Sequence, residues 1–235
     1  MFSPRARFLS ILLPAFGLAM PLSANADPTW PHLFKEAALP KSDATPAKVS
    51  YQSEIIQVDD EEWGKLVYQI ENSAETGIKV RVETFPTEGD QADIEEELNE
   101  DQDGEIWCDD YNEIIGGPVE LVSETDSEAI FSFNANADSA EDKQERKILG
   151  KTRITVNVDK SLKEITQFKY ELTESVKPMM VAKIDTFELV GTCASHENGR
   201  PIVTKVATKI TGRAMGQSFG QNSLQTFKNF TVSAQ

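Results

Sequence analysis

Apolar and polar residues alternate through most of the chain after residue 65, as they do in β-strands that bury one face. The clearest example is a hairpin with the inward positions Ile154, Val156 and Val158, a turn at 159–162, and the inward positions Phe168, Tyr170 and Leu172. The same pattern predicts strands at 66–70, 78–82, 119–124, 129–135, 181–193, 202–212 and 224–232. In the strand at 202–212, Ile202, Val206 and Ile210 are predicted to share a face. Nine or ten short strands with little helix indicate a mainly β, antiparallel domain.

The stretch before these strands has a different character. Residues 1–26 carry Arg5 and Arg7, an apolar stretch from Phe8 to Leu22, and Ala24-Asn25-Ala26 at the end. This is the pattern of a secretory signal peptide cleaved after Ala26, and it predicts a periplasmic or secreted protein. Residues 27–48, rich in Pro and Ala, are predicted to form an N-terminal arm with a short helix near 33–39. A single β domain is predicted over 49–235, with no membrane-spanning segment after the signal peptide.

Charge is distributed unevenly in this chain of net charge −16. Residues 27–142 hold 31 acidic and 6 basic side chains, whereas residues 143–235 hold 8 acidic and 15 basic ones. The acidic part would repel phosphate groups, so nucleic acid is not expected as a partner. Two explanations remain open for the basic part: it packs against the acidic part, or it meets an anionic lipid or protein surface.

An acidic insertion at 88–110 interrupts the strands, with 12 acidic residues and no basic one. Within it, the spacing of oxygen-bearing residues resembles the twelve-residue calcium loop of EF-hand proteins, with Gly104 at the sharp turn. The candidate ligands are Asn99, Asp101, Asp103, Glu105 and Asp110. A helix at 92–98 would precede the loop, and a second helix lined by Tyr111, Ile114 and Ile115 would follow it. The alternative is a solvated acidic loop that binds no metal.

The two cysteines, Cys108 and Cys193, form an even and isolated pair. In an exported protein such a pair predicts a disulfide, whereas a metal or redox pair would favour the CxxC spacing that is missing here. Enzyme motifs are also missing from the sequence, and the only histidines are His32 and His196. The triplet Ser195-His196-Glu197 is no triad, because neighbouring residues on an extended chain point to opposite sides. No catalytic residue is predicted, and no cofactor other than calcium.

Residues 118–230 resemble the periplasmic lipoprotein-carrier superfamily, which sorts lipoproteins to the outer membrane. The resemblance lies in the rhythm of the hairpins, the aromatic inner positions and the ending Gly212-Arg213-Ala214-Met215-Gly216 with Phe227-Lys228-Asn229-Phe230. It implies one strongly curved antiparallel sheet, a half-barrel with a few short helices, whose apolar concave face shelters acyl chains.

The aromatic inner positions therefore have two interpretations: a packed core, or the wall of a ligand cavity. The candidate ligand-binding residues are Phe131, Phe133, Phe168, Tyr170 and Phe187. Three functions follow as hypotheses. The first is a non-enzymatic protein that binds a lipid, an acyl chain or a lipoprotein on its concave face. The second is a disulfide-linked interaction domain of the cell envelope, and the third is a secreted hydrolase that uses carboxylates.

Overall fold

The computed structural model describes most of the chain after residue 28, and the predicted signal peptide lies outside the described residues. The described residues are 29–40, 47–57, 65–73, 75, 77–85, 91–101, 106–111, 113–140, 142–197 and 199–234.

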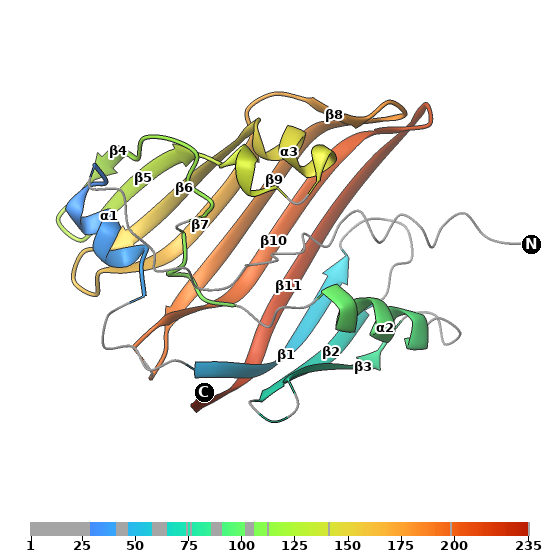
Figure 1. Ribbon diagram of the computed structural model, residues 1–235, viewed down its shortest axis with the longest axis horizontal. Coiled ribbons are helices and arrows are strands. Elements are labelled where there is room, and N and C mark those ends of the chain that lie inside the picture. Colours follow the sequence, from blue (N-terminus) through green and yellow to red (C-terminus); the bar gives the residue numbers. More distant parts are fainter. Residues whose placement is uncertain are drawn as a thin grey trace, which may run out of the picture.

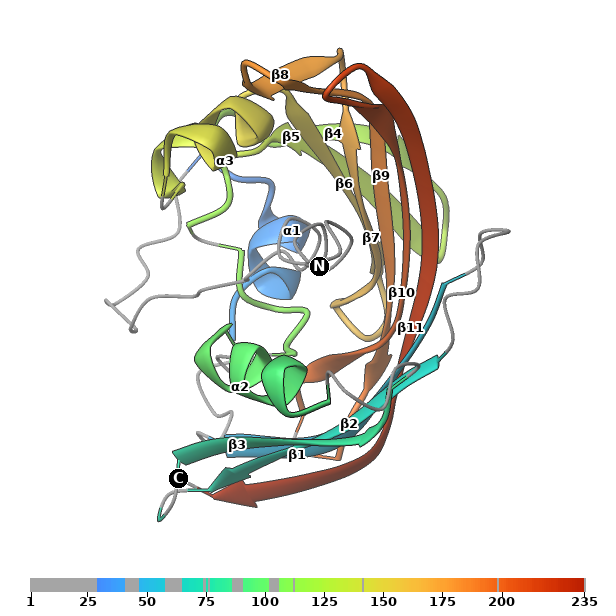
Figure 2. The same cartoon turned by 90° about the vertical axis from the view of Figure 1, so that its right-hand side faces the viewer.

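Eleven strands form one antiparallel sheet in the described part of the chain. Their order is β3-β2-β1-β11-β10-β9-β7-β6-β5-β4, and β8 pairs with the start of β9. The sheet ends at β3 and β4 without closing, and it curves strongly into a trough (Figures 1 and 2). The strands are β1 (Ala47–Gln57), β2 (Lys65–Ser73), β3 (Gly77–Thr84), β4 (Glu120–Glu124), β5 (Glu128–Asn134), β6 (Thr152–Asp159), β7 (Glu164–Leu172), β8 (Val176–Met179), β9 (Ala182–Ser195), β10 (Pro201–Ala214) and β11 (Gln217–Ala234). The predicted fold class, a single curved antiparallel sheet with a few short helices, is confirmed.

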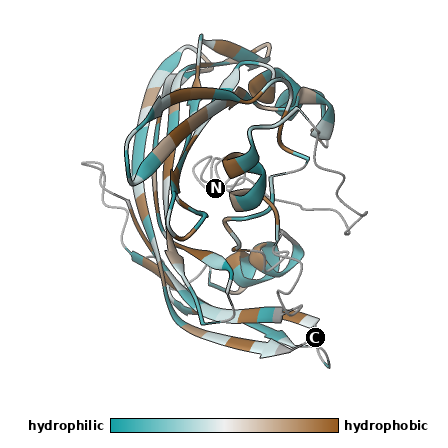
Figure 3. Ribbon diagram, turned by 90° about the vertical axis from the view of Figure 1, so that its left-hand side faces the viewer, coloured by the Kyte–Doolittle hydropathy of each residue, from teal (hydrophilic) through white to brown (hydrophobic). Residues whose placement is uncertain are grey.

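The predicted hairpins are present with the expected inward faces. In the β6–β7 hairpin, Ile154, Val156 and Val158 are fully buried. The β2–β3, β4–β5 and β9–β10 hairpins also form where the alternation predicts them. Brown and teal positions alternate along these strands in Figure 3, as expected when one face of a sheet is buried.

β1 was not predicted as a strand. It pairs with β2 on one side and β11 on the other, and its inward positions include Val49, Tyr51 and Ser53. Ser53 is fully buried although it is polar. A buried serine interrupts the apolar alternation from which the other strands were predicted, so the periodicity alone was insufficient here.

Ile202, Val206 and Ile210 were predicted to share a face of β10, but a β-bulge separates Ile202 from the other two, and Ile202 is buried in the cluster around Leu98. The register of β10 against β9 shifts between Val203 and Lys205, because β10 has one extra residue there. Val203 therefore pairs with Cys193 on the same face as Val206, whereas Ile202 pairs with Ala194.

Three short helices accompany the sheet in the described residues: α1 (His32–Ala37), α2 (Gln91–Asp101) and α3 (Lys143–Leu149). α1 and α2 lie where short helices were predicted. α3 lies in a charged segment for which the sequence predicted no helix. The side chain of Asp142 accepts hydrogen bonds from the backbone N–H groups of Gln144 and Glu145 and so caps this helix. None of the described helices is both long and apolar enough to cross a membrane.

The helix predicted around Tyr111, Ile114 and Ile115 is also absent from the described residues. Ile115 instead forms an isolated β-bridge with Ala135, and the N–H of Gly116 donates to the carbonyl of Asn134. The segment thus runs beside the end of β5, where the sheet satisfies its backbone groups.

The inner face of the sheet carries three hydrophobic clusters, each of which we name after the helix that packs on it. The α1 core contains Phe34 of α1 with the inward residues of β5, β6 and β7. The α2 core contains Leu98 of α2 with the inward residues of β1, β2 and β3. The α3 core consists of Val176, Ile184 and Ile210, with Ile148 of α3 packed against them. Figure 2 shows the three helices on the concave side of the sheet.

Candidate functional site

Four of the five predicted ligand-binding residues lie in the α1 core. Phe131 and Phe133 are almost fully buried, and Phe34 of α1 packs edge-on against both rings with centroid distances of 5.5 Å. Phe168 and Tyr170 are also buried and pack edge-on against each other at 5.8 Å. In this conformation the four rings contact protein, and Phe34 of α1 packs on Phe131 and Phe133. Their role in binding stays a prediction.

Phe168 lies directly over Gly191 of the neighbouring strand β9. A Cβ atom at Gly191 would come within 2.0 Å of the Phe168 ring. The missing side chain thus lets the ring lie flat on the inner face, a known way of covering a glycine in a sheet.

Phe187, the fifth predicted residue, is only half-buried and lies between the α1 and α3 cores. It belongs to a set of half-buried inward positions in the middle of the sheet, which we name the inner strip. The strand registers place these residues on one face: Val206 pairs with Gly191 and Gln225, and Thr208 pairs with Leu189 and Ser223. The inner strip comprises Phe187, Val206, Thr208, Gln221, Ser223, Gln225 and Phe227.

The helices pack mainly on either side of this strip. α1 contacts β6 and β7, α2 contacts β3, and α3 contacts β8. The inner strip lies on β9, β10 and β11 and combines apolar side chains with hydroxyl and amide groups. A surface of this composition suits an amphiphile, whose chain and polar group need different contacts.

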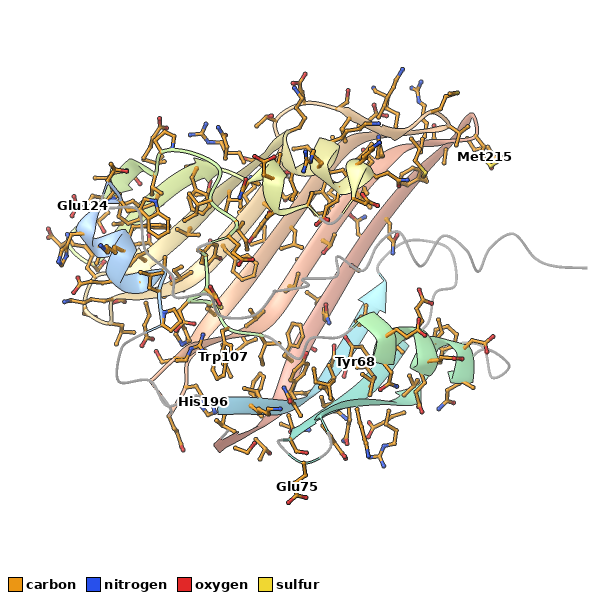
Figure 4. The ribbon with its side chains drawn as sticks, in the orientation of Figure 1. Tyr68, Glu75, Trp107, Glu124, His196 and Met215 are labelled. Carbon is orange, nitrogen blue, oxygen red and sulfur yellow. A yellow bond between two sulfur atoms is a disulfide. The ribbon has the colours of Figure 1, made fainter. Side chains whose placement is uncertain are left out.

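One end of the inner strip joins a buried polar network. The side-chain amide of Gln225 donates to the hydroxyl oxygens of Ser53, at 2.9 Å, and Tyr68, at 3.1 Å. Ser53 and Tyr68 are fully buried, and burial raises the pKa of the Tyr68 phenol. The network is neutral and satisfies polar groups that would otherwise be costly to bury. Figure 4 labels Tyr68 among the side chains near α2.

The predicted disulfide between Cys108 and Cys193 is confirmed, with a Cα–Cα distance of 6.3 Å. It joins the segment 106–109 to β9. Two backbone hydrogen bonds attach the same segment to β10: Cys108 N–H donates to Pro201, and Val203 N–H donates to Ile106. The chain between the α2 region and β4 is thereby fixed at one end of the trough.

A buried ion pair beside the disulfide was not predicted. The guanidinium of Arg200 donates to both carboxylate oxygens of Asp109, with N–O distances from 2.6 to 3.1 Å, and lies 4.2 Å from the ring centroid of Trp107. Burial raises the pKa of Asp109, and the adjacent guanidinium opposes that shift. The predicted disulfide places Asp109, the neighbour of Cys108, close to the end of β9, and this was the available signal.

Two buried tyrosines meet in the α1 core. The side chains of Tyr111 and Tyr170 are hydrogen-bonded, and burial raises the pKa of both phenols. Tyr111 also packs edge-on against Phe133 at 6.1 Å. The pair therefore links the segment that follows the disulfide to β7.

The predicted calcium loop is described only in part. Asn99 lies in α2, where its side chain bonds to the backbone N–H and carbonyl of Val80 in β3 and to the carbonyl of Glu95. Asp101 ends α2, and Asp103 and Glu105 lie outside the described residues. Asn99 would have to leave β3 to bind a cation. Within the described ranges no group of three or more His, Cys, Asp or Glu residues is arranged to hold a metal. The calcium site stays a prediction.

The two histidines lie in α1 and directly after β9. His32 is highly exposed on α1, with Nδ1 3.1 Å from a carboxylate oxygen of Glu36. In the triplet 195–197, the hydroxyl of Ser195 donates to Glu164 of β7. The serine is thus bonded to a carboxylate on a neighbouring strand, an arrangement that holds the two strand ends together.

Comparison with known proteins identifies no family for the chain. No family model matches it, and no curated protein matches it. Among solved structures, a DUF1329 family protein from Desulfovibrio piger is similar at 14% identity and a TM-score of 0.34, covering 80% of this chain and 86% of that one.

Proposed function

We propose that this protein is a non-enzymatic binding protein that takes a lipid, an acyl chain or an acylated protein on its concave face. The inner strip is the observation on which the proposal depends. Phe187, Val206 and Phe227 remain half-buried on the inner face, at the places where the helix-covered cores end. Each CH₂ group that moves from water onto such a surface contributes about 0.8 kcal/mol.

The polar members of the strip suit the other end of an amphiphile. Thr208 and Ser223 are register partners on β10 and β11, so their side chains lie side by side on the inner face. Hydroxyl groups there can donate to a carboxylate or ester oxygen of the ligand. The proposed ligand therefore places its chain along Phe187 and Val206 and its polar group at the hydroxyl pair.

The proposed compartment is the periplasm or the extracellular space. The predicted signal peptide is the main argument, and the Cys108–Cys193 disulfide supports it, because such bonds persist in oxidising compartments. Amphiphiles need a protein carrier in these aqueous spaces.

The test is ligand binding by the purified full-length mature protein. Native mass spectrometry would detect lipid that co-purifies from the cell envelope. Titrations with palmitate, a phospholipid and a lipidated peptide would then give affinities, and a bound ligand should raise the melting temperature as its concentration rises. The proposal is wrong if none of the three ligands binds and no lipid co-purifies.

A matched pair of valines tests the location. Val206 on β10 faces inward, whereas Val190 on β9 pairs with Lys169 and Ala207 on the outer face, and both are half-buried. Val206→Gln should weaken binding about ten-fold, because a valine contact contributes roughly 1.5 kcal/mol. Val190→Gln should leave the affinity unchanged. Equal effects of the two substitutions would contradict the inner strip as the site.

A second candidate, a protein-interaction domain, is favoured by β4. This strand lies at the edge of the sheet, all five of its residues are exposed, and Leu121 and Val122 are 50% and 58% exposed. An exposed edge strand can pair with an extended peptide. Failure of all lipid titrations would make this the preferred function.

A further inference from the structure

Two hairpin turns meet at the end of the sheet far from the disulfide. One turn joins β8 to β9 at Met180 and Val181, and the other joins β10 to β11 at Met215 and Gly216. The N–H of Met215 donates to the carbonyl of Val181 at 2.8 Å, so the turns are bonded to each other. We name Met180, Val181 and Met215 the methionine tip. Figure 4 labels Met215 at the end of the sheet that lies away from His196.

The methionine tip is unusually exposed for apolar side chains. Met180 is 100% exposed, Met215 81% and Val181 60%. They are three of the seven large hydrophobic residues exposed in the described part of the chain, and they include the two most exposed. Exposed apolar groups gathered at one place mark a surface that another apolar phase covers.

The backbone conformation at Met215 argues that its exposed side chain does not serve folding alone. Met215 and Gly216 have φ values of 52° and 83°, as in the two-residue hairpin turn that strongly prefers Asn-Gly. A methionine adopts this left-handed conformation less readily than Asn or Gly. The turn therefore carries a strained residue with an exposed apolar side chain, a combination that folding alone does not favour.

Positive charge surrounds the tip although the whole chain is strongly acidic. Lys177, Lys183 and Arg213 flank the two turns, and Lys147 of α3 donates to the carbonyl of Pro178 in β8. Asp185 is the nearest acidic residue along β9, and it is paired with Lys183. No acidic residue follows Glu197, and β10 brings the positive charges of Lys209 and Arg213 toward this end.

We infer that the methionine tip is a docking site for an anionic phospholipid membrane. The unbranched methionine side chains and Val181 enter the interface between headgroups and acyl chains, and the exposed cations Lys177 and Arg213 pair with lipid phosphates. The net charge of −16 keeps the rest of the molecule off an anionic surface, so the tip sets the orientation. This inference is independent of ligand binding on the inner strip.

Vesicle co-sedimentation tests the inference with the full-length mature protein. Vesicles of equimolar phosphatidylcholine and phosphatidylglycerol should bind the protein, and pure phosphatidylcholine vesicles should bind it much more weakly. Binding to the anionic vesicles should fall as salt is added, because ions screen the cations of the tip. No binding to the anionic vesicles would overturn the inference, as would equal binding to both compositions.

Substitutions locate the site. Met180→Ser combined with Met215→Asn removes the apolar contacts while giving the turn its preferred residue, so the variant should fold and lose at least about ten-fold in vesicle binding. Lys177→Gln and Arg213→Gln should each cost roughly five-fold on anionic vesicles. Undiminished binding of the double methionine variant would overturn the inference.

Two controls separate this site from other surfaces. Leu162 is 50% exposed in the β6–β7 turn at the opposite end of the sheet, and Leu162→Ser should not change vesicle binding. Val206→Gln on the inner strip should also bind vesicles as the unmodified protein does. A loss of vesicle binding in the Leu162 variant as large as that in the methionine variant would contradict a localised tip.

Discussion

Phe34 holds α1 on one side of the trough and so determines which part of the inner face is covered there. Its ring is fully buried and contacts Phe131 and Phe133, while α1 itself has only six residues. No side chain caps the N-terminus of this helix, where Pro31 precedes it. A helix this short is not stable alone. The position of α1 on the sheet therefore depends on burial of Phe34 and its neighbours.

Phe34→Ala should lower the free energy of unfolding by about 3–5 kcal/mol, the usual loss for a fully buried ring. Urea titration followed by circular dichroism measures it. Lys35→Ala, at an exposed position of the same helix, should change stability by less than about 0.5 kcal/mol. A Phe34 variant as stable as the Lys35 variant would show that α1 contributes nothing to the α1 core.

At the scale of elements, the sequence predicts what local periodicity determines. The β6–β7 hairpin follows from alternation alone, because every second position from Ile154 to Val158 and from Phe168 to Tyr170 is apolar and buried. Alternation does not predict β1, because its inward position Ser53 is polar. The buried hydroxyl accepts a hydrogen bond from Gln225, a residue far along the chain. α3 is not predicted for another reason. None of its residues is buried, so the sequence shows no apolar stripe there, and the one clear signal is the helix cap at Asp142.

Asp142→Ala should therefore weaken α3 specifically. The carboxylate accepts from the N–H groups of Gln144 and Glu145, and loss of such a cap costs about 0.5–2 kcal/mol. Urea titration gives the change in stability, and hydrogen exchange should accelerate in residues 143–149. Asn also caps helices well, so Asp142→Asn should retain most of the stability. Equal losses in both variants would indicate that the charge of Asp142, and not its cap, stabilises the helix.

At the scale of the whole molecule, three separate cores line one open sheet, and contacts between distant segments decide what covers each part. The sequence predicted the sheet, its curvature and the disulfide. The sequence did not show that the five predicted ligand-binding residues fall into two groups. Four rings contact protein in the α1 core, and Phe187 lies in the half-buried inner strip. That division depends on how the N-terminal helix packs over β6 and β7, a tertiary contact with no local signal. The Asp109–Arg200 pair, 91 residues apart, has no local signal either, and the predicted disulfide was the one indication that the two segments meet.

The buried tyrosines make the whole fold sensitive to alkaline pH. Burial raises the pKa of Tyr68 in the α2 core and of Tyr111 and Tyr170 in the α1 core above the ordinary value of 10.0. Below that value the phenols are neutral in both states and their stabilisation is complete. Above it, only the unfolded chain releases these protons, so stability falls as pH rises, by about 1.4 kcal/mol per pH unit for each tyrosine.

An alkaline titration followed by phenolate absorbance and circular dichroism should therefore show one cooperative step. The phenolate signal of the buried tyrosines should appear together with loss of the β-sheet spectrum, because unfolding exposes both cores. The free energy of unfolding of Tyr111→Phe should fall less steeply with pH, because this variant has one ionising phenol fewer. The comparison is made after the difference in stability at neutral pH has been subtracted. Complete phenolate formation near pH 10 with an intact β-sheet spectrum would show that these phenols reach water in the folded protein, and that neither core is closed.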